Sequence, residues 1–391
     1  SPYAMVVTVP GGDPELPPAV FLAHYDVVDA PNESEWSHPP FAGRIADGSV
    51  WGRGALDDKG VLMAILEAVE ALLVSGYRPR RTLILAFGGD EETSGEKGAQ
   101  TIASFLKERN VRAEFVIDEG SIVASAGMVP FLPGSIALIG VGEKGVVDLV
   151  FTATAAEGHA SMPPAQSAVG ALARGLAKIE KRQPTRLPAS VKAFLRALGN
   201  AAGGPLGFVM KHPDLFGPII RRVFRGNPQT NALICTTLAP TMLQGSHASN
   251  VLPKTAEAVV NCRILPGDSV ERLLARMRRR VARLPVTVSI RPGQPALDPV
   301  PESPADSWVY NEISETVGTL FPDAVPAPFL VTVTTDSKHY RGISDRIYRF
   351  IPYELDSDRV ATLHGTDERV TIEEYTTAIR FYTELIRRTT I

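Results

Sequence analysis

Residues 81–95, RTLILAFGGDEETSG, contain a short apolar run that leads through two glycines to a pair of adjacent acids. The same pattern of an apolar run followed by ionisable side chains occurs twice more, after AVFL at 19–22 and after FVI at 115–117. The side chains that follow the three runs are His24 and Asp26, Glu91 and Glu92, and Asp118 and Glu119. In an open α/β sheet the carboxyl ends of the strands line the ligand crevice. We therefore expect these side chains to converge, and a metal site is the economical explanation.

The rest of the chain organises around this pattern. Up to residue 142, strand-like runs alternate with helix-like stretches, which is typical of a mostly parallel α/β sheet flanked by helices. From 143 to 295 the order changes to strand, helix, two strands, helix and strand, which predicts an inserted α+β two-layer domain, with the ferredoxin-like arrangement as one candidate. The alternation resumes after a Pro-rich linker. The sequence thus predicts a catalytic domain made of 1–142 and 296–391, with 143–295 as an inserted lid or dimerisation domain.

Two helix starts carry local capping signals. Thr371 with Glu374 predicts a capping box at the start of the last helix, and Asp268 with Glu271 suggests another at the last helix of the inserted domain.

Composition excludes several classes of protein. The chain has 391 residues with a formal net charge of −3, and the near balance of acids and bases gives no electrostatic signature of nucleic-acid binding. No apolar run reaches the roughly 18 residues that a membrane span requires. The start, SPYAMVVTVPG, has neither an initiator methionine nor a signal-peptide pattern, so we expect a chain whose true N-terminus is missing and whose compartment the sequence does not identify.

The two cysteines, Cys235 and Cys262, lie in apolar strand-like runs, where a buried free thiol is the usual outcome. A disulfide scaffold and a cysteine zinc site are therefore excluded.

The segment WGRGALDDKG places Asp57 and Asp58 at the entrance of a helix, beside glycines that let the backbone turn sharply. Residues two apart on a strand share a face, so His24 can bind a metal while Asp26 accepts a hydrogen bond from its other ring nitrogen. Neighbouring Glu91 and Glu92 point to opposite sides, so one can bind metal while the other faces the substrate.

A second imidazole, His364, lies in a distant loop before Gly365. Two histidines with several carboxylates are typical of a two-metal hydrolase. Oxygen and nitrogen ligands without cysteine suit zinc, and manganese or cobalt would fit as well.

Eight segments, in the same order and spacing, resemble the aminoacylase/carboxypeptidase family of two-zinc metallopeptidases, which includes carboxypeptidase G, carboxypeptidase S, aminoacylase and succinyl-diaminopimelate desuccinylase. They are HYDVVDAP, WSHPPFAGRIADGSVWGRGALDDKG, GGDEETSG, VIDEG, GHASMPP, NVLP, NCRILPG and the late HG. NPQTNALICTTLAPTML and TTDSKHY followed by IYRF are most similar to the carboxypeptidase S and N-acyl-amino-acid hydrolase branch. The resemblance implies hydrolysis of the amide bond of a small peptide or N-acyl amino acid that carries a free carboxylate.

The resemblance also implies roles for single residues. The implied metal ligands for two zinc ions are His24, Asp57, Glu92, Asp118 and His364, with Asp57 bridging, His24 and Asp118 on one ion, and Glu92 and His364 on the other. The implied catalytic residues are Glu91 as general base, Asp26 orienting His24, and His159 stabilising the oxyanion, often in the site of a partner subunit. The implied substrate contacts are Arg263 and Asn250. A homodimer through the inserted domain is the corresponding expectation for assembly.

Some of the residues with implied roles also have a purely structural interpretation. His159 could be a loop histidine and Arg263 a structural ion-pair residue, and the remaining histidines, at 38, 212, 247 and 339, are expected to be surface or packing residues. The apolar segment 187–226 predicts either a pocket for a long acyl group, on Phe194, Leu195, Phe208 and Met210, or helix packing or a dimer contact.

Other functions fit less well. A metal-free, inactive binding protein on the same scaffold would be expected to have lost a ligand. A serine hydrolase lacks its G-x-S-x-G motif, and the match Gly140-x-Gly142-x-x-Gly145 precedes a strand-like run where a dinucleotide-binding helix should begin.

Overall fold

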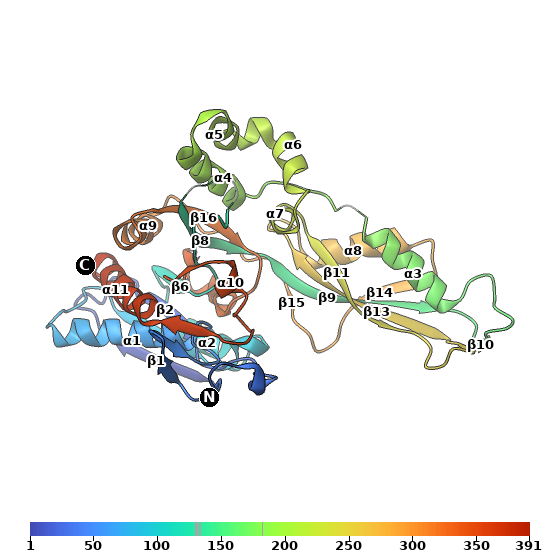
Figure 1. Ribbon diagram of the computed structural model, residues 1–391, viewed down its shortest axis with the longest axis horizontal. Coiled ribbons are helices and arrows are strands. Elements are labelled where there is room, and N and C mark those ends of the chain that lie inside the picture. The colour runs from blue at the N-terminus through green and yellow to red at the C-terminus, as the bar shows by residue number, and fades with distance from the viewer. Residues whose placement is uncertain (130–131, 133, 182) are drawn as a thin grey trace. The chain divides into compact units, whose positions relative to one another are not determined.

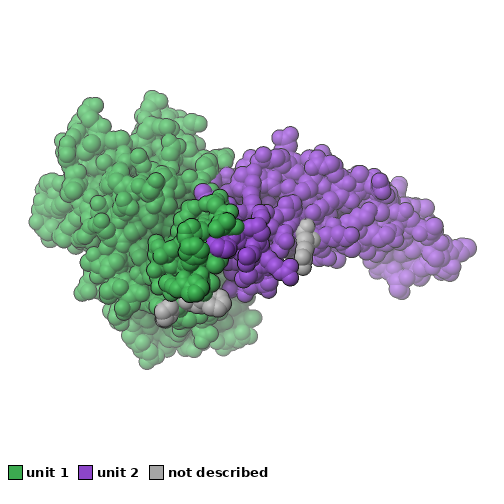
Figure 2. Space-filling view, turned by 90° about the horizontal axis from the view of Figure 1, so that it is seen from above, with its two compact units in different colours: residues 1–142, 192–215, 301–391 green, residues 143–191, 216–300 purple. Residues whose placement is uncertain are grey.

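The computed structural model describes residues 1–129, 132, 134–181 and 183–391. The chain divides into two compact units, coloured separately in Figure 2: unit 1 comprises residues 1–142, 192–215 and 301–391, and unit 2 comprises 143–191 and 216–300. Residues 192–215 lie within the predicted inserted domain but group with unit 1. The role of the inserted domain as a lid or a dimer contact stays a prediction.

Unit 1 is built on one large sheet. Its strands among the described residues are β1 (Ala4–Val9), β2 (Ala19–His24), β5 (Leu83–Gly88), β6 (Phe115–Asp118), β7 (Val123–Ala124), β8 (Ser135–Glu143), β16 (Ala324–Val331), β17 (Ile347–Arg349) and β18 (Glu354–Leu355). The order is β1-β5-β2-β6-β17-β8-β7-β18, with β16 also beside β8. The central run β5-β2-β6-β17 is parallel, whereas β1 pairs antiparallel with β5.

Helices cover both faces of this sheet, which explains why its central strands are apolar at every position before their last residues. Residues such as Phe21 and Leu85 pack against α1 (Lys59–Val74), α9 (Trp308–Leu320) and α11 (Ile372–Thr389). The alternate residues, such as Val20 and Ile84, pack against α2 (Ala99–Glu108) and the 3-10 segment η3 (Asp336–Gly342). In Figure 1, α1 and α11 lie side by side. The predicted α/β class with a mostly parallel, helix-flanked sheet is confirmed.

The strand register brings the predicted site residues to one edge. His24 is the last residue of β2 and lies opposite Gly88, the last residue of β5. Asp118 is the last residue of β6, on the other side of β2. Because these three strands are parallel, their carboxyl ends meet, and the short 3-10 turn η2 (Glu91–Thr93) follows β5 at the same edge.

A small sheet joins two distant parts of unit 1. It has the order β19-β4-β3, with β3 (Arg44–Ala46), β4 (Ser49–Trp51) and β19 (Arg369–Thr371). The antiparallel pair β19 and β4 aligns Arg369 with Trp51, so the segments that follow β4 and precede β19 run next to each other. Unit 1 also contains two short elements, η1 (Glu33–Glu35) and α10 (Ser357–Val360).

Unit 2 has the predicted α+β order. Its main strands are β9 (Gly145–Thr154), β11 (Thr237–Gln244), β13 (Thr255–Ile264) and β14 (Val286–Ile290), and its main helices are α3 (Ala168–Ile179) and α8 (Val270–Val281). The antiparallel strand order β11-β13-β9-β14 is the ferredoxin-like arrangement that the sequence named as a candidate. Shorter elements are β10 (Gly158–His159), β12 (Val251–Leu252), β15 (Ala296–Leu297) and α7 (Pro228–Ala232).

The cysteines of unit 2 are buried free thiols, as expected, and burial raises the pKa of Cys262 to about 12.

The apolar segment 187–226 forms three helices, α4 (Ala189–Ala202), α5 (Gly204–Lys211) and α6 (Pro213–Phe224). Phe194 and Leu195 are buried, and Phe194 packs with Leu198 and Ala327 in a core cluster that Met210 and Phe329 border. Phe208 is exposed instead. This placement favours the packing alternative for Phe194 over an open acyl pocket.

Of the two predicted helix caps, one is confirmed and one is wrong. Thr371 and Glu374 form the predicted capping box at the start of α11. The prediction at Asp268 was wrong by one residue, because Ser269 caps α8 while the Asp268 carboxylate accepts a hydrogen bond from Arg276. Every helix among the described residues is too short or too polar to cross a membrane.

The packing of α11 generates a stability prediction. Leu385 lies on the buried face of α11 and is completely buried in the core, so Leu385→Ala should lower the free energy of unfolding by about 2–5 kcal/mol. The matched truncation Val74→Ala, at a side chain that is 81% exposed, should change it by less than about 0.5 kcal/mol. All three tryptophans, at 36, 51 and 308, lie in unit 1, so tryptophan fluorescence in urea follows this unit. Equal effects of the two substitutions would contradict the assigned core.

Candidate metal centre

His24 lies at the centre of the cluster of ionisable groups at the sheet edge. Its ring is buried, with Nε2 2.9 Å from Asp57 Oδ1 and Nδ1 3.1 Å from the backbone oxygen of Asp26. Nδ1 also lies 3.4 Å from Asp26 Oδ1. Burial by itself lowers the pKa of His24, but the hydrogen bonds to Asp26 and Asp57 raise it above its ordinary value. The ring is therefore held from both nitrogens, with Nε2 directed at Asp57.

Asp57 divides its two carboxylate oxygens between the two predicted histidine ligands. Oδ1 faces His24, and Oδ2 lies 3.1 Å from Nε2 of His364. Burial opposes ionisation here, yet hydrogen bonds with His24 and His364 hold the pKa of Asp57 below its usual range. The same hydrogen bond is the main cause that raises the pKa of His364. One carboxylate thus connects two imidazoles from segments more than three hundred residues apart.

Glu92 completes a set of side chains that fits a divalent metal ion. Ligand atoms of His24, Asp57 and Glu92 all lie within 4.8 Å of one another. Glu92 Oε1 is 3.3 Å from His364 Nε2, but it is buried and accepts no hydrogen bond. A buried carboxylate oxygen without a donor needs a compensating positive charge. Imidazole nitrogens and carboxylate oxygens together are suitable ligands for zinc and similar ions.

Asp26 holds the turn that carries the two glutamates. Its Oδ1 accepts a hydrogen bond from the Glu91 N–H, and its Oδ2 accepts one from the Glu92 N–H, both at 3.1 Å. The Asp26 carboxylate therefore contacts the backbone of η2 as well as the edge of His24. Burial and the neighbouring carboxylate of Asp336 raise the pKa of Glu91 to about 8.

Asp118 is buried at the end of β6, where its Oδ2 accepts a 2.7 Å hydrogen bond from the Ser337 N–H. Its neighbour Glu119 is surrounded by acids, and burial together with Asp118 and Asp57 raises the pKa of Glu119 well above its usual range. Asp118 is not part of the compact triplet of His24, Asp57 and Glu92.

The remaining predicted site residues belong to unit 2, whereas the residues described above belong to unit 1. His159 is exposed on β10, with Nδ1 2.7 Å from the Ser161 hydroxyl. Asn250 is exposed, and its backbone oxygen accepts a hydrogen bond from the Ala160 N–H. Arg263 is half-buried on β13 and donates to the side-chain oxygen of Asn261.

Three buried charged residues beside the centre were not predicted from the sequence. Asp58 is fully buried, and burial raises its pKa, whereas the adjacent Asp57 faces the histidines. Glu368 and Arg53 are buried against each other beneath the loop that carries Asp57. A signal was present, because both charges lie within a few residues of predicted ligands, in GRGALDD and HGTDER. Their pairing could not be inferred from local spacing.

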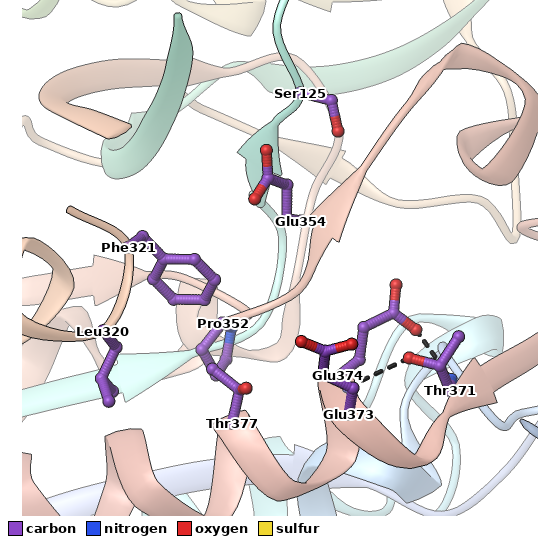
Figure 3. Close-up of a pocket in the computed structure, with 9 residues that line it drawn as sticks. All are labelled: Ser125, Leu320, Phe321, Pro352, Glu354, Thr371, Glu373, Glu374 and Thr377. Atoms are coloured by element: carbon purple, nitrogen blue, oxygen red, sulfur yellow. Dashed lines mark hydrogen bonds between the residues drawn. The ribbon is translucent and has the colours of Figure 1, made fainter. Parts of the chain in front are cut away.

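A cavity of about 410 Å³ in unit 1 shares no residue with this cluster (Figure 3). It is lined by Ser125, Leu320, Phe321, Pro352, Glu354, Thr371, Glu373, Glu374 and Thr377. Glu374 is engaged in the capping box and in an ion pair with Arg359, and Glu354 accepts a hydrogen bond from Ser135. Glu354 and Glu374 therefore serve the local structure.

Comparison with known proteins agrees with the geometry. Residues 20–388 match Peptidase family M20/M25/M40. The chain is 37% identical to the N-fatty-acyl-amino acid synthase/hydrolase PM20D1 of Mus musculus, over 98% of this chain and 76% of the relative. It is also 37% identical to the probable carboxypeptidase S-like 2 of Dictyostelium discoideum, over 99% of this chain and 74% of that protein.

Among solved structures, the fold is similar to that of the M20 family metallo-carboxypeptidase Sso-CP2 from Sulfolobus solfataricus. The TM-score is 0.72, with 17% identity over 98% of this chain and 87% of that one. The resemblance found in the sequence is thus confirmed. The chain belongs to Peptidase family M20/M25/M40, within the branch of carboxypeptidase S and the N-acyl-amino-acid hydrolases, and it is a metal-dependent hydrolase.

Proposed function

We propose that this chain hydrolyses the amide bond of an N-acyl amino acid or a small peptide with a free carboxylate, using two zinc ions. The observation that carries this proposal is the position of Asp57, whose two oxygens face His24 and His364 separately. A carboxylate shared in this way is suited to bridge two cations. Manganese or cobalt would fit the same oxygen and nitrogen ligands.

The surrounding residues support a division of the ligands between two ions. His24 and Asp118 end the adjacent strands β2 and β6, which supports assigning one ion to them. Glu92 Oε1 and His364 Nε2 lie 3.3 Å apart, and we assign the second ion to this pair. Two such ions would supply a lowered pKa of bound water, toward about 7, and polarisation of the substrate's carbonyl.

Glu91 is the proposed general base. It sits beside the ligand Glu92 on η2, and the hydrogen bonds from both backbone N–H groups to Asp26 fix that turn. From this position its carboxylate would take a proton from the attacking water and deliver it to the leaving nitrogen. A base of this kind contributes on the order of 10²–10⁴ in rate.

The residues of unit 2 are proposed to act on the substrate. His159 is exposed and would donate a hydrogen bond to the oxygen that becomes negative in the transition state. Arg263 and Asn250 would contact the free carboxylate and the substrate backbone. A homodimer that brings His159 to a partner's site remains part of this proposal. The alternative of an inactive, metal-free protein is disfavoured, because the ligands and Glu91 are all present.

A substrate screen with metal removal tests the function. Purified protein should hydrolyse a series of N-acyl amino acids or dipeptides, lose this activity after treatment with a chelator, and regain it when Zn²⁺ is added back. Blocking the substrate's carboxylate as an amide should abolish turnover. Activity that survives complete removal of the metal would refute the proposal. Within the series, turnover that does not change with acyl chain length would remove the long-acyl pocket from consideration.

The role of Glu91 predicts a separation of binding from chemistry. Glu91→Gln keeps the size of the side chain but cannot accept a proton, so kcat should fall by about 10²–10⁴ while the metal content stays near that of the unmodified protein. Glu96→Gln makes the same change at an exposed position a few residues along and should have no effect on kcat. Metal analysis alongside steady-state kinetics is the measurement. Full activity in Glu91→Gln would rule out this base.

The bridging role of Asp57 predicts a joint loss of both ions. Asp57→Ala removes the carboxylate that both histidines face, so both ions should be lost or greatly weakened together. Asp323→Ala, at an exposed acid of unit 1, should bind two ions normally. Elemental analysis after dialysis gives the stoichiometry. A variant that keeps one ion tightly and loses the other would contradict a bridging carboxylate.

A further inference from the structure

Glu368 is a carboxylate buried in unit 1 with every acceptor position in use. Its side chain is completely shielded from solvent. Oε1 accepts hydrogen bonds from the N–H groups of Leu56 at 2.8 Å and Asp57 at 3.1 Å. Oε2 accepts from the Gly54 N–H at 3.0 Å and from Arg53 Nη1 at 2.5 Å. The Glu368 side chain thus binds the backbone of the loop from Gly54 to Asp57.

Arg53 extends this hold to the loop of the second histidine. Its Nη2 donates a 2.8 Å hydrogen bond to the backbone oxygen of Gly365, the residue that follows His364. Its guanidinium lies over the ring of Trp36, 5.3 Å from the ring centre, and is buried. The Arg53–Glu368 pair therefore ties together the two loops that carry Asp57 and His364.

Strand pairing explains why these loops meet at this pair. Glu368 immediately precedes β19, Arg53 follows β4 by two residues, and the two strands are antiparallel neighbours. A further backbone hydrogen bond joins the Gly52 N–H to the Glu368 oxygen at 3.0 Å. Gly54 has a φ of +80°, and a Cβ there would lie 2.4 Å from Val27 Cγ1, so the loop can follow this path only with glycine. The pairing of β4 with β19 and the conformation of Gly54 thus determine where the loop places Asp57.

We propose that Glu368, with Arg53, is a positioning residue of the metal centre: it holds Asp57 in the orientation in which one oxygen faces each histidine. Metal ligands need outer hydrogen bonds to keep their orientation, and loss of such a partner typically costs about 10–100-fold in metal affinity or activity. The inference rests on the proposed two-metal function, because it assigns the group that orients the bridging ligand. Glu368 itself faces four protein donors, which leaves no oxygen for an ion.

The negative charge is the property that the site requires. A glutamine at 368 would present one oxygen and one NH₂ group, so two of the four donors would face another donor. A buried group left in this state loses its hydrogen bonds without regaining water, and Arg53 would lose its counter-charge. The loop from Gly54 to Asp57 should then shift or loosen, which moves Asp57 away from the point between the histidines. Aspartate keeps the charge but is shorter by one methylene.

The test measures metal binding directly, without substrate. Metal-free protein is titrated with Co²⁺, whose visible absorption reports ligand geometry, and with Zn²⁺ against a competing chelator. Glu368→Gln should bind both ions about 10–100-fold more weakly, and its Co²⁺ spectrum at saturation should differ from that of the unmodified protein. The metal affinity of Glu368→Asp should lie between those of the unmodified protein and Glu368→Gln. Excess Zn²⁺ should restore only part of the hydrolytic activity of Glu368→Gln.

Glu114→Gln is the matched control for a general loss of stability. Glu114 also belongs to unit 1, accepts a hydrogen bond from Arg346 and pairs with Arg81, but it precedes β6 at the end away from the centre. Its thermal unfolding temperature should fall, whereas its metal affinity and Co²⁺ spectrum should stay unchanged. Equal effects of Glu114→Gln and Glu368→Gln on metal binding would overturn the inference.

The outcomes separate this inference from the function on which it rests. An unmodified chain that binds no metal ions refutes the proposed function and, with it, any positioning role. An unmodified chain that binds two ions, together with a Glu368→Gln variant of equal affinity and spectrum, leaves the function intact and refutes only the role of Glu368. If Glu368→Gln does not fold, Glu368→Asp gives the same decision, because a positioning role requires a changed Co²⁺ spectrum there as well.

Discussion

The common direction of strands β5, β2 and β6 is the constraint on which the rest of the centre depends. Because these neighbours are parallel, the residues at their carboxyl ends meet, and His24, Asp118 and the turn of Glu91 and Glu92 are delivered to one edge. Helices on both faces bury the strands completely, so their ends cannot drift apart without breaking the core. The site residues can then lie on short loops supported by a rigid sheet. Asp57, in the loop before α1, lies between the imidazoles of His24 and His364.

The electrostatics of this edge follow from crowding acids in a buried place. Burial and mutual repulsion raise the pKa values of Asp58, Glu91 and Glu119, while the histidines keep the pKa of Asp57 low. Such a cluster is costly for the folded protein unless positive charge is supplied, and two divalent ions would supply it. The outer Arg53–Glu368 pair differs, since it is balanced within the protein and needs no ion. The buried acids around Asp57 therefore need cations to balance their charge, whereas the charges of Arg53 and Glu368 balance each other.

Local patterns in the sequence were reliable wherever one segment contained both partners of an interaction. The apolar runs became the central strands, and Thr371 with Glu374 formed its capping box. The cap of α8 was misplaced by one residue because Asp268 found a tertiary partner in Arg276, and a competing ion pair cannot be seen from spacing. Likewise, Phe194 is a candidate pocket residue from the sequence, but it is buried against Leu198 of its own helix and Ala327 of the distant strand β16.

By itself, the sequence determined the α/β class, the succession of strands and helices in the inserted domain and the family, because these depend on periodicity and on motifs that are continuous in the chain. Only the tertiary structure showed that Asp57 directs one oxygen at each histidine while Asp58 is buried beside it, and that Glu368 supports the Asp57 loop from 311 residues away. The physical reason is that a carboxylate's role is set by the donors around it. Those donors come from backbone N–H groups and side chains that are brought together only when distant strands such as β4 and β19 pair.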